Sequence, residues 1–169
     1  MNPGDMRRLT ILVAEDDEDD FYIFLLALQE TGLPVTVLRA ENGDRLMAML
    51  HESAPDILFL DIDMPCKNGQ QCLSEIRSDK RLDALPVVMY SSFDDVNHVD
   101  YCFGHGANLY LVKPNRFSEF VTTIKNVLTR DWTMRLDRAE FLIQTTVSKI
   151  SRTMTDPGGA TPAPPSTHS

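Results

Sequence analysis

The sequence predicts an α/β fold in which a five-stranded parallel sheet carries helices on both faces. Short apolar runs alternate with amphipathic stretches five times along the chain, and this alternation is typical of parallel strands joined by right-handed crossover helices. The run 57–60 is apolar at every position, as expected for a strand that is covered on both faces. With 169 residues, 43% of them hydrophobic, the chain can bury such a core.

The first two strands and helices are predicted over residues 9–52. Residues 9–14 form an apolar strand, and the next helix has one apolar face, made by Phe21, Phe24, Leu25 and Leu28. Gly32 and Pro34 end this helix. Residues 35–38 form the second strand. A short helix follows and ends before Pro55, with an apolar face made by Leu46, Met49 and Leu50.

The remaining strands are predicted at residues 57–61, 87–90 and 109–112. The helix after the first of these carries Cys72, Leu73 and Ile76 on one face. The helix after the second carries Val96, Val99 and Phe103. The last helix has the clearest amphipathic pattern of the chain, with Phe117, Phe120, Val121, Ile124 and Leu128 on one face.

We predict one domain over residues 8–130, because all five strand and helix units fall within it. Residues 131–154 form a C-terminal extension, and their apolar side chains fit either an additional helix or an extended arm with residues 141–143 packed against the domain. Residues 155–169 hold four prolines and no large apolar side chain, so we expect a disordered tail there.

Composition excludes several classes of protein. Three cysteines without a CxxC pair argue against both a disulfide framework and a structural zinc site. A formal net charge of −9 argues against binding to nucleic acid or to an anionic membrane. No apolar run reaches the ~20 residues of a membrane span, and residues 9–14 are too few for a secretory signal. We therefore expect a soluble, cytoplasmic protein.

Acidic side chains follow two of the predicted strands. Glu15 and Asp16 come directly after the first strand, and Asp61 ends the third. Because ligand sites of open α/β sheets lie at the carboxyl ends of the strands, these three carboxylates are expected to lie together. Carboxylates that lie close together raise one another's pKa or bind a cation. Carboxylate oxygens are the ligands that Mg²⁺ prefers, so Mg²⁺ is the expected ion. The remaining acids of the run, residues 17–20, are assigned to the cap and first turn of the next helix.

Two further polar residues are expected at the same edge of the sheet. Lys113 follows the fifth strand, where its ammonium group can pair with Asp61 or with a phosphoryl group placed on Asp61. Ser91 follows the fourth strand and offers a hydroxyl donor to the same oxygens.

Taken together, these motifs resemble the receiver domain of two-component response regulators over about residues 8–130. The shared motifs are the acidic pair Glu15-Asp16, the run Asp-x-x-Met-Pro-x-x-x-Gly at residues 61–69, Ser91, the aromatic Tyr110 and Lys113-Pro114. The resemblance implies a flavodoxin-like fold with strand order 2-1-3-4-5, which is the order found in the chemotaxis regulator of this family.

The resemblance also implies a phosphoacceptor site. Asp61 would accept a phosphoryl group from the phosphohistidine of a sensor histidine kinase. Mg²⁺ would be bound by Asp16 and Asp61, by Glu15 through a water molecule, and by the backbone carbonyl of Asp63. Such a protein is not an enzyme beyond self-catalysed phosphotransfer and autodephosphorylation.

The remaining motif residues would stabilise the phosphoryl group or change conformation when it is present. The resemblance implies that Lys113 stabilises its oxygens, that Ser91 moves toward it and that Tyr110 turns inward. It also implies that the Lys113–Pro114 bond is often cis. This sequence has Glu15 where many members have Asp, and Ser91 where Thr is more usual.

Three other hypotheses fit parts of the pattern. Asp61-x-Asp63 resembles the nucleophile and general acid of haloacid dehalogenase phosphohydrolases, but in that family the nucleophile strand comes first, whereas here Glu15-Asp16 precedes it. A receiver-shaped binding module that is never phosphorylated would lack one of the motif residues, and none is missing. A receiver joined to a DNA-binding domain needs more chain than the part that follows residue 130.

We therefore expect a single-domain response regulator that signals through contact with a downstream protein. The sequence is loosely similar to the regulators that pair with phytochrome-type kinases, judging from residues 15–17, the loop 64–69 and the stretch after Trp132. A homodimer, formed through the fourth and fifth helices or through the C-terminal extension, is one further hypothesis.

Overall fold

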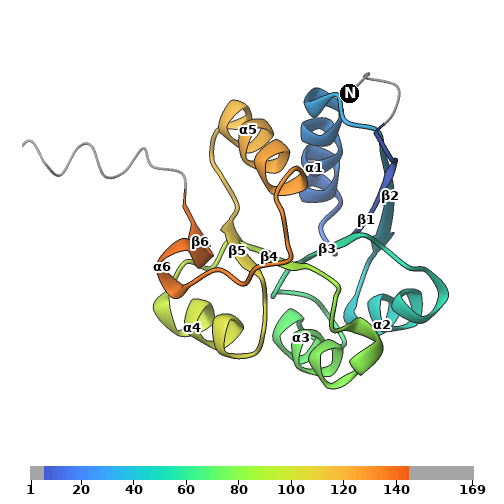
Figure 1. The fold of residues 1–169 in the computed structure, drawn as a ribbon, viewed down its shortest axis with the longest axis vertical. Coiled ribbons are helices and arrows are strands. Elements are labelled where there is room, and N and C mark those ends of the chain that lie inside the picture. Colours follow the sequence, from blue (N-terminus) through green and yellow to red (C-terminus); the bar gives the residue numbers. More distant parts are fainter. Residues whose placement is uncertain (1–5, 145–169) are drawn as a thin grey trace, which may run out of the picture.

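The computed structural model describes residues 6–144 and shows one parallel sheet between two layers of helices (Figure 1). The strands are β1 (Leu9–Ala14), β2 (Val35–Ala40), β3 (Ile57–Leu60), β4 (Val87–Ser91), β5 (Leu109–Val112) and β6 (Leu142–Ile143). The helices are α1 (Glu18–Thr31), α2 (Gly43–Glu52), α3 (Gly69–Ser78), α4 (Val96–Gly104), α5 (Phe117–Leu128) and α6 (Arg138–Phe141), with a short 3₁₀ helix at Lys80–Leu82.

The sheet has the order β2-β1-β3-β4-β5-β6, and all its pairs are parallel. The predicted order of the first five strands is confirmed, and β6 adds a sixth strand beside β5. Among the described residues, no helix is both long and apolar enough to cross a membrane. The predicted tail at 155–169 lies outside the described residues.

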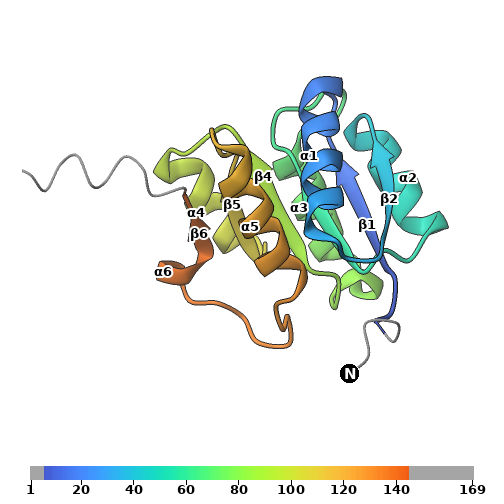
Figure 2. The same cartoon turned by 90° about the horizontal axis from the view of Figure 1, so that it is seen from above.

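Alternate side chains of each strand enter two separate cores. Helices α1 and α5 cover one face of the sheet, and α2, α3 and α4 cover the other (Figures 1 and 2). In β3, Phe59 packs on the α1 and α5 side, whereas Leu58 and Leu60 pack on the opposite side. The first core contains an aromatic cluster formed by Phe24, Phe59, Tyr90 and Phe120. Burial on both faces explains why β3 is apolar at every position.

The predicted boundaries of α1 are confirmed by its caps. The side chain of Asp17 accepts a hydrogen bond from the backbone N–H of Asp20, which is a typical N-cap contact. Gly32 ends the helix with φ of 69°, a left-handed conformation that glycine adopts without a steric penalty.

The predicted apolar face of α4 is partly wrong. The helix packs on the sheet through Val99 and Cys102, while Val96, expected on that face, is 61% exposed. The helix has nine residues and two buried side chains, so its periodic pattern is too short to fix which residues face the core. Phe117, the first residue of α5, is likewise exposed rather than buried.

The segment after α5 returns to the edge of the sheet. β6 pairs with β5, with Leu142 opposite Tyr110, and Phe141 is buried beside the rings of Phe103 and Tyr110 at centroid distances of 5.1 and 6.3 Å. The described part of the extension thus contains a short helix and an extended piece with 141–143 packed on the domain. Its remainder, 145–154, lies outside the described residues, and the domain limit at residue 130 stays a prediction.

Gly69 lies where the start of α3 meets the end of β3. Its N–H donates to the carbonyl of Ile62 at 2.9 Å, and a Cβ atom at this position would lie 2.0 Å from the carbonyl oxygen of Asp61. A backbone carbonyl cannot move away as a flexible side chain can. Any residue larger than glycine would therefore displace either α3 or the backbone of Asp61.

Gly69→Ala is expected to lower the free energy of unfolding by about 2–3 kcal/mol, because the new methyl group overlaps buried backbone. Gly104→Ala is the matched control, since a Cβ at that helical position meets no atom within 4 Å, and it should stabilise the protein by up to about 1 kcal/mol. Urea unfolding followed by circular dichroism measures both. A change below about 0.5 kcal/mol for Gly69→Ala would contradict the close approach.

Candidate functional site

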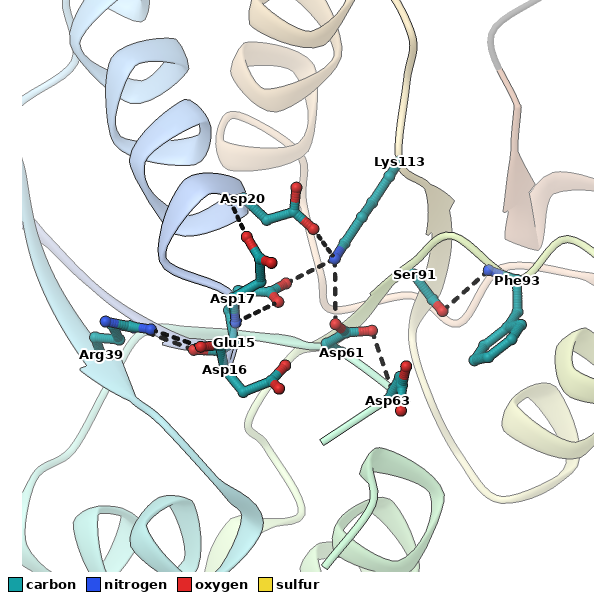
Figure 3. A network of polar contacts seen from close by, with 10 residues as sticks. All are labelled: Glu15, Asp16, Asp17, Asp20, Arg39, Asp61, Asp63, Ser91, Phe93 and Lys113. Atoms are coloured by element: carbon teal, nitrogen blue, oxygen red, sulfur yellow. Dashed lines mark hydrogen bonds and ion pairs between the residues drawn. The ribbon is translucent and has the colours of Figure 1, made fainter. Parts of the chain in front are cut away.

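A polar pocket of about 300 Å³ opens at the carboxyl ends of the strands (Figure 3). It is lined by Glu15, Asp16, Asp17, Asp20, Asp61, Asp63, Ser91, Ser92, Phe93 and Lys113. Six of the seven predicted site residues are in this set, and Tyr110 is the exception. These residues lie at or just after the ends of β1, β3, β4 and β5. Because the strands are parallel, their carboxyl ends lie at the same edge of the sheet, which brings the residues together.

Three carboxylates form the centre of the pocket. Glu15, Asp16 and Asp61 each offer an oxygen atom, and these atoms lie within 4.8 Å of one another. Glu15 and Asp61 are buried, whereas Asp16 is exposed. Oxygen ligands on one side and solvent on the other match the way Mg²⁺ is bound in proteins, with several coordination positions kept for water or phosphate. The donor set therefore fits a hard divalent cation.

Lys113 is the cation within this acidic group. Its Nζ donates to Glu15 Oε2 and Asp20 Oδ2, both at 2.8 Å, and to Asp61 Oδ2 at 3.1 Å. The side chain of Lys113 is only 13% exposed. Burial disfavours its charge, but the hydrogen bonds to Asp20 and Glu15 outweigh this effect and raise the pKa of Lys113. The lysine therefore stays charged at neutral pH.

The two buried carboxyl groups have raised pKa values. Burial raises the pKa of Glu15 from 4.5 to about 7, although the hydrogen bond from Lys113 opposes the shift. Burial also raises the pKa of Asp61, again against the influence of Lys113. Lys113 thus offsets only part of the cost of burying the charged carboxylates of Glu15 and Asp61. Binding of a further cation, or protonation of one carboxyl group, would lower that cost.

Asp63 and Ser91 line the pocket beside Asp61, and each takes part in a hydrogen bond with a backbone N–H. The N–H of Asp63 donates to Asp61 Oδ1 at 3.3 Å. Ser91 is buried at the end of β4, and its Oγ accepts from the N–H of Phe93 at 3.2 Å. Both residues therefore lie at the pocket, as the sequence predicted.

Comparison with known proteins identifies the family. The profile of the response regulator receiver domain matches residues 11–125, more than half of the chain. The chain belongs to the response regulator receiver domain family. Its members are parts of two-component signalling systems.

Relatives agree with this assignment. The protein PilH of Pseudomonas aeruginosa is 31% identical over 118 residues, which cover 70% of this chain and 96% of PilH. The crystal structure of the phosphorylated cyanobacterial phytochrome response regulator RcpA is 27% identical, has a TM-score of 0.67 and matches 72% of this chain and 91% of that one. The bacteriophytochrome response regulator RtBRR is 29% identical with a TM-score of 0.64, over 78% and 84% of the two chains.

Tyr110 lies outside the pocket but is linked to it. In this receiver its ring is fully buried on the face covered by α2, α3 and α4, and its hydroxyl donates to the carbonyl oxygen of Phe93 at 2.6 Å. Burial raises the pKa of Tyr110. Phe93 therefore contacts Ser91 through its N–H and Tyr110 through its carbonyl. The ring of Tyr110 thus points inward in this structure, and its role as a switch stays a prediction.

The Lys113–Pro114 peptide bond is trans, because the described residues contain no cis bond. This differs from the cis isomer that is frequent in the family. Trans is the more favourable isomer of an X-Pro bond by ~0.5–1 kcal/mol.

Several residues at the pocket were not among the predicted site residues, namely Asp17, Asp20, Ser92 and Phe93, which line it, and Arg39, which lies behind it. Asp20, assigned to the first turn of α1, also pairs with Lys113, and Arg39 bonds to the backbone at the acidic pair. Helical spacing could have identified Asp20, since it precedes the buried Phe24 by four residues and Leu28 by eight, and so lies on the same face. No sequence pattern pointed to Arg39.

Glu15 is expected to change the pH dependence of stability in the metal-free protein. Its pKa is about 7 in the folded state and near 4.5 when unfolded, so the folded state binds more protons between these values. Its contribution to stability is therefore present below pH 4.5 and is lost as pH rises to about 7. The difference in unfolding free energy between wild type and Glu15→Gln, measured from pH 4 to 8 with chelator present, should fall with pH; a rise would contradict the shift.

Proposed function

We propose that this receiver is a single-domain response regulator that accepts a phosphoryl group on Asp61 from a sensor histidine kinase. The observation that carries the proposal is the setting of Asp61, a carboxylate 4% exposed at the end of β3. Its Oδ2 accepts from Lys113, and it borders a pocket that holds further acids (Figure 3). In its ionised form this carboxylate can act as a nucleophile, and the ammonium group of Lys113 offsets part of the effect of burial on its charge.

The transfer uses groups of this chain in defined roles. An oxygen of ionised Asp61 attacks phosphorus, the N–P bond of the phosphohistidine breaks, and its electron pair returns to the imidazole nitrogen. The product is an acyl phosphate on Asp61. Lys113 supplies positive charge beside the reacting oxygen, and its ammonium group can move from Glu15 and Asp20 to the new phosphoryl oxygens. No general base is needed, because Asp61 reacts as an anion.

Mg²⁺ is the proposed cofactor. Asp16 and Asp61 would bind it directly, Glu15 through water, and Asp63 through its backbone carbonyl. The bound ion would neutralise charge on the transferring phosphoryl group. The close approach of three carboxylates, two of them buried with raised pKa values, supports a cation here.

Ser91 and Tyr110 are proposed to carry the signal away from the pocket. Both bond to Phe93, Ser91 through the backbone N–H and Tyr110 through the carbonyl. A move of the Ser91 hydroxyl toward a phosphoryl group would break the first bond and release the loop between β4 and α4. The expected result is a change in the surface around α4, β5 and α5, where a downstream protein would bind.

Relatives support the choice of partner and organisation. RcpA is described as a phosphorylated phytochrome response regulator and RtBRR as a bacteriophytochrome response regulator, so a phytochrome-type kinase is the proposed partner. PilH, 96% of which is covered by the match, is a relative of receiver length, whereas the match covers 26% of the NtrC regulator of Salmonella typhimurium. A net charge of −9 favours a protein target over nucleic acid or a membrane, and a cytoplasmic location follows from the proposed kinase.

Phosphorylation is tested by intact mass after incubation with acetyl phosphate. Wild type is expected to gain one phosphoryl group when Mg²⁺ is present and none in chelator, because the reacting phosphoryl group needs its charge neutralised. Asp61→Asn should abolish the adduct, since an amide is not an anionic nucleophile.

Asp83→Asn is the matched control, because it removes an exposed aspartate that does not line the pocket. It should gain the phosphoryl group as wild type does. If folded wild type gains none, an unphosphorylated binding module is the better function; if unrelated phosphoesters are hydrolysed continuously, a phosphohydrolase is.

A homodimer is proposed at the edge of the sheet that β6 forms. β6 is an edge strand, and edge strands with free backbone groups readily pair with another chain. The first residues of the two helices that follow β4 and β5, Val96 of α4 and Phe117 of α5, are apolar and exposed. Light scattering after size exclusion is expected to show a dimer at high micromolar concentration, and Val96→Asp to shift it toward monomer. A wild type that stays monomeric there rules the dimer out.

A further inference from the structure

We propose that Arg39 is a positioning residue for the acidic pair, holding the backbone of Glu15 and Asp16 so that their carboxylates face the cation site. This inference rests on the proposed function, because the cation is part of it. Arg39 lies near the carboxyl end of β2, beside β1 in the sheet. It does not line the pocket and was not among the predicted site residues.

Arg39 binds two consecutive carbonyl groups. Its Nε donates to the carbonyl oxygen of Glu15 at 3.1 Å and its Nη2 to that of Asp16 at 3.0 Å (Figure 3). The guanidinium also lies over the ring of Phe21, 4.9 Å from its centroid, and the side chain is only 19% exposed. Arg39 thus connects β2, the loop after β1 and the first turns of α1.

These bonds continue the pairing of β1 with β2 past the end of the strands. The last paired residues are Ala14 and Ala40, and the N–H of Glu15 donates to the carbonyl of Ala40 at 3.0 Å. Beyond that point β2 turns away toward Asn42, the N-cap of α2. The backbone of β2 then offers no further donors to β1, and the side chain of Arg39 supplies two in their place.

The contacts of Arg39 differ from those of Lys113. Lys113 bonds to carboxylate oxygens, including that of Glu15, whereas Arg39 bonds to the backbone behind them. Among the described residues, the carboxylate that Arg39 pairs with is Glu41, at 3.9 Å. Arg39 therefore holds the loop in place without occupying the oxygens that a cation needs.

Holding the loop has a physical purpose in this pocket. Carboxylates that crowd together repel one another, and a loop without other restraints relieves the repulsion by turning one of them away. Two hydrogen bonds from a rigid guanidinium oppose that movement. Lysine cannot replace the arginine here, because its single ammonium lacks the planar pair of donors.

A charge effect and a positioning effect predict opposite results. If Arg39 acted on a bound cation only through its charge, then removing it would lessen repulsion and tighten Mg²⁺ binding. If Arg39 positions the ligands, then removing it weakens Mg²⁺ binding. Arg39→Lys separates the two further, because it keeps the charge and loses the paired donors.

The test compares Arg39→Gln and Arg39→Lys with wild type by calorimetric titration of Mg²⁺ into the full chain. Both variants are expected to bind Mg²⁺ about tenfold more weakly, as is typical when a residue that orients a metal ligand is lost. Arg8→Gln is the matched control, because Arg8 also donates to a backbone carbonyl, that of Val35 at 2.8 Å, at the opposite end of the β1–β2 pair. It should keep the affinity of wild type.

Two further readouts distinguish positioning from general loss of structure. At saturating Mg²⁺, both variants should be phosphorylated by acetyl phosphate at a rate within about twofold of wild type, so that the defect lies in metal affinity alone. Without metal, the N–H of Asp17, which donates to Glu15 Oε1 at 3.2 Å, should exchange with deuterium faster in both variants.

Several results would overturn the proposal. Unchanged or tighter Mg²⁺ binding by Arg39→Gln would show that Arg39 does not position the ligands, while leaving the proposed function intact. An equal loss of affinity in Arg8→Gln would assign the effect to general destabilisation. A wild-type protein that binds no Mg²⁺ would overturn this inference together with the proposed metal site.

Discussion

Lys113 bonds to Glu15, Asp20 and Asp61 in a pocket where two of these three carboxyl groups come from strand ends. Burying one carboxylate is costly, and burying two side by side is tolerated only when a cation or a proton compensates them. Lys113 compensates part of the negative charge. The pKa values of Glu15 and Asp61 are still raised by burial, so their charged forms remain disfavoured without a further cation. The donor set of the pocket therefore fits a divalent cation, in agreement with the proposed function.

This arrangement depends on a rigid support on both faces of the sheet. The strands that end at the pocket lie between two cores, so the backbone of Asp61 cannot move without disturbing one of them. The start of α3 approaches the same backbone so closely that Gly69 has no room for a side chain. From the other side, Arg39 restrains the loop after β1. The position of the acids is thus fixed in part by Gly69 and Arg39, which do not line the pocket.

The edge of the sheet at β5 connects the pocket with the C-terminal segment. Tyr110 bonds to Phe93 at the pocket side and packs beside Phe141 from the extension. Additional contacts hold the extension, namely the ion pair of Arg138 with Asp100 and the bond from Arg135 to the carbonyl of Phe103. A change in the position of the Phe93 backbone would therefore be passed through Tyr110 to Phe141, and so to the segment that contains β6.

The parallel sheet, its two helical layers and the edge where the acids lie could all be predicted from the sequence. Each of these follows from local features, because a strand buried on both faces is apolar throughout and a helix repeats its apolar residues at a fixed spacing. Asp61, Glu15, Asp16, Ser91 and Lys113 could be predicted as neighbours from their positions after strands, since parallel strands end at a common edge.

The contacts between distant segments could not be predicted and became visible only in the folded structure. Asp20 pairs with a lysine 93 residues away, and Arg39 reaches the backbone of residues 24 and 23 positions earlier. The exposure of Val96 and the pairing of β6 with β5 depended in the same way on how segments pack. Such contacts leave no periodic signal in the sequence, because they are set by the spacing and crossover of elements rather than by the residues next to them.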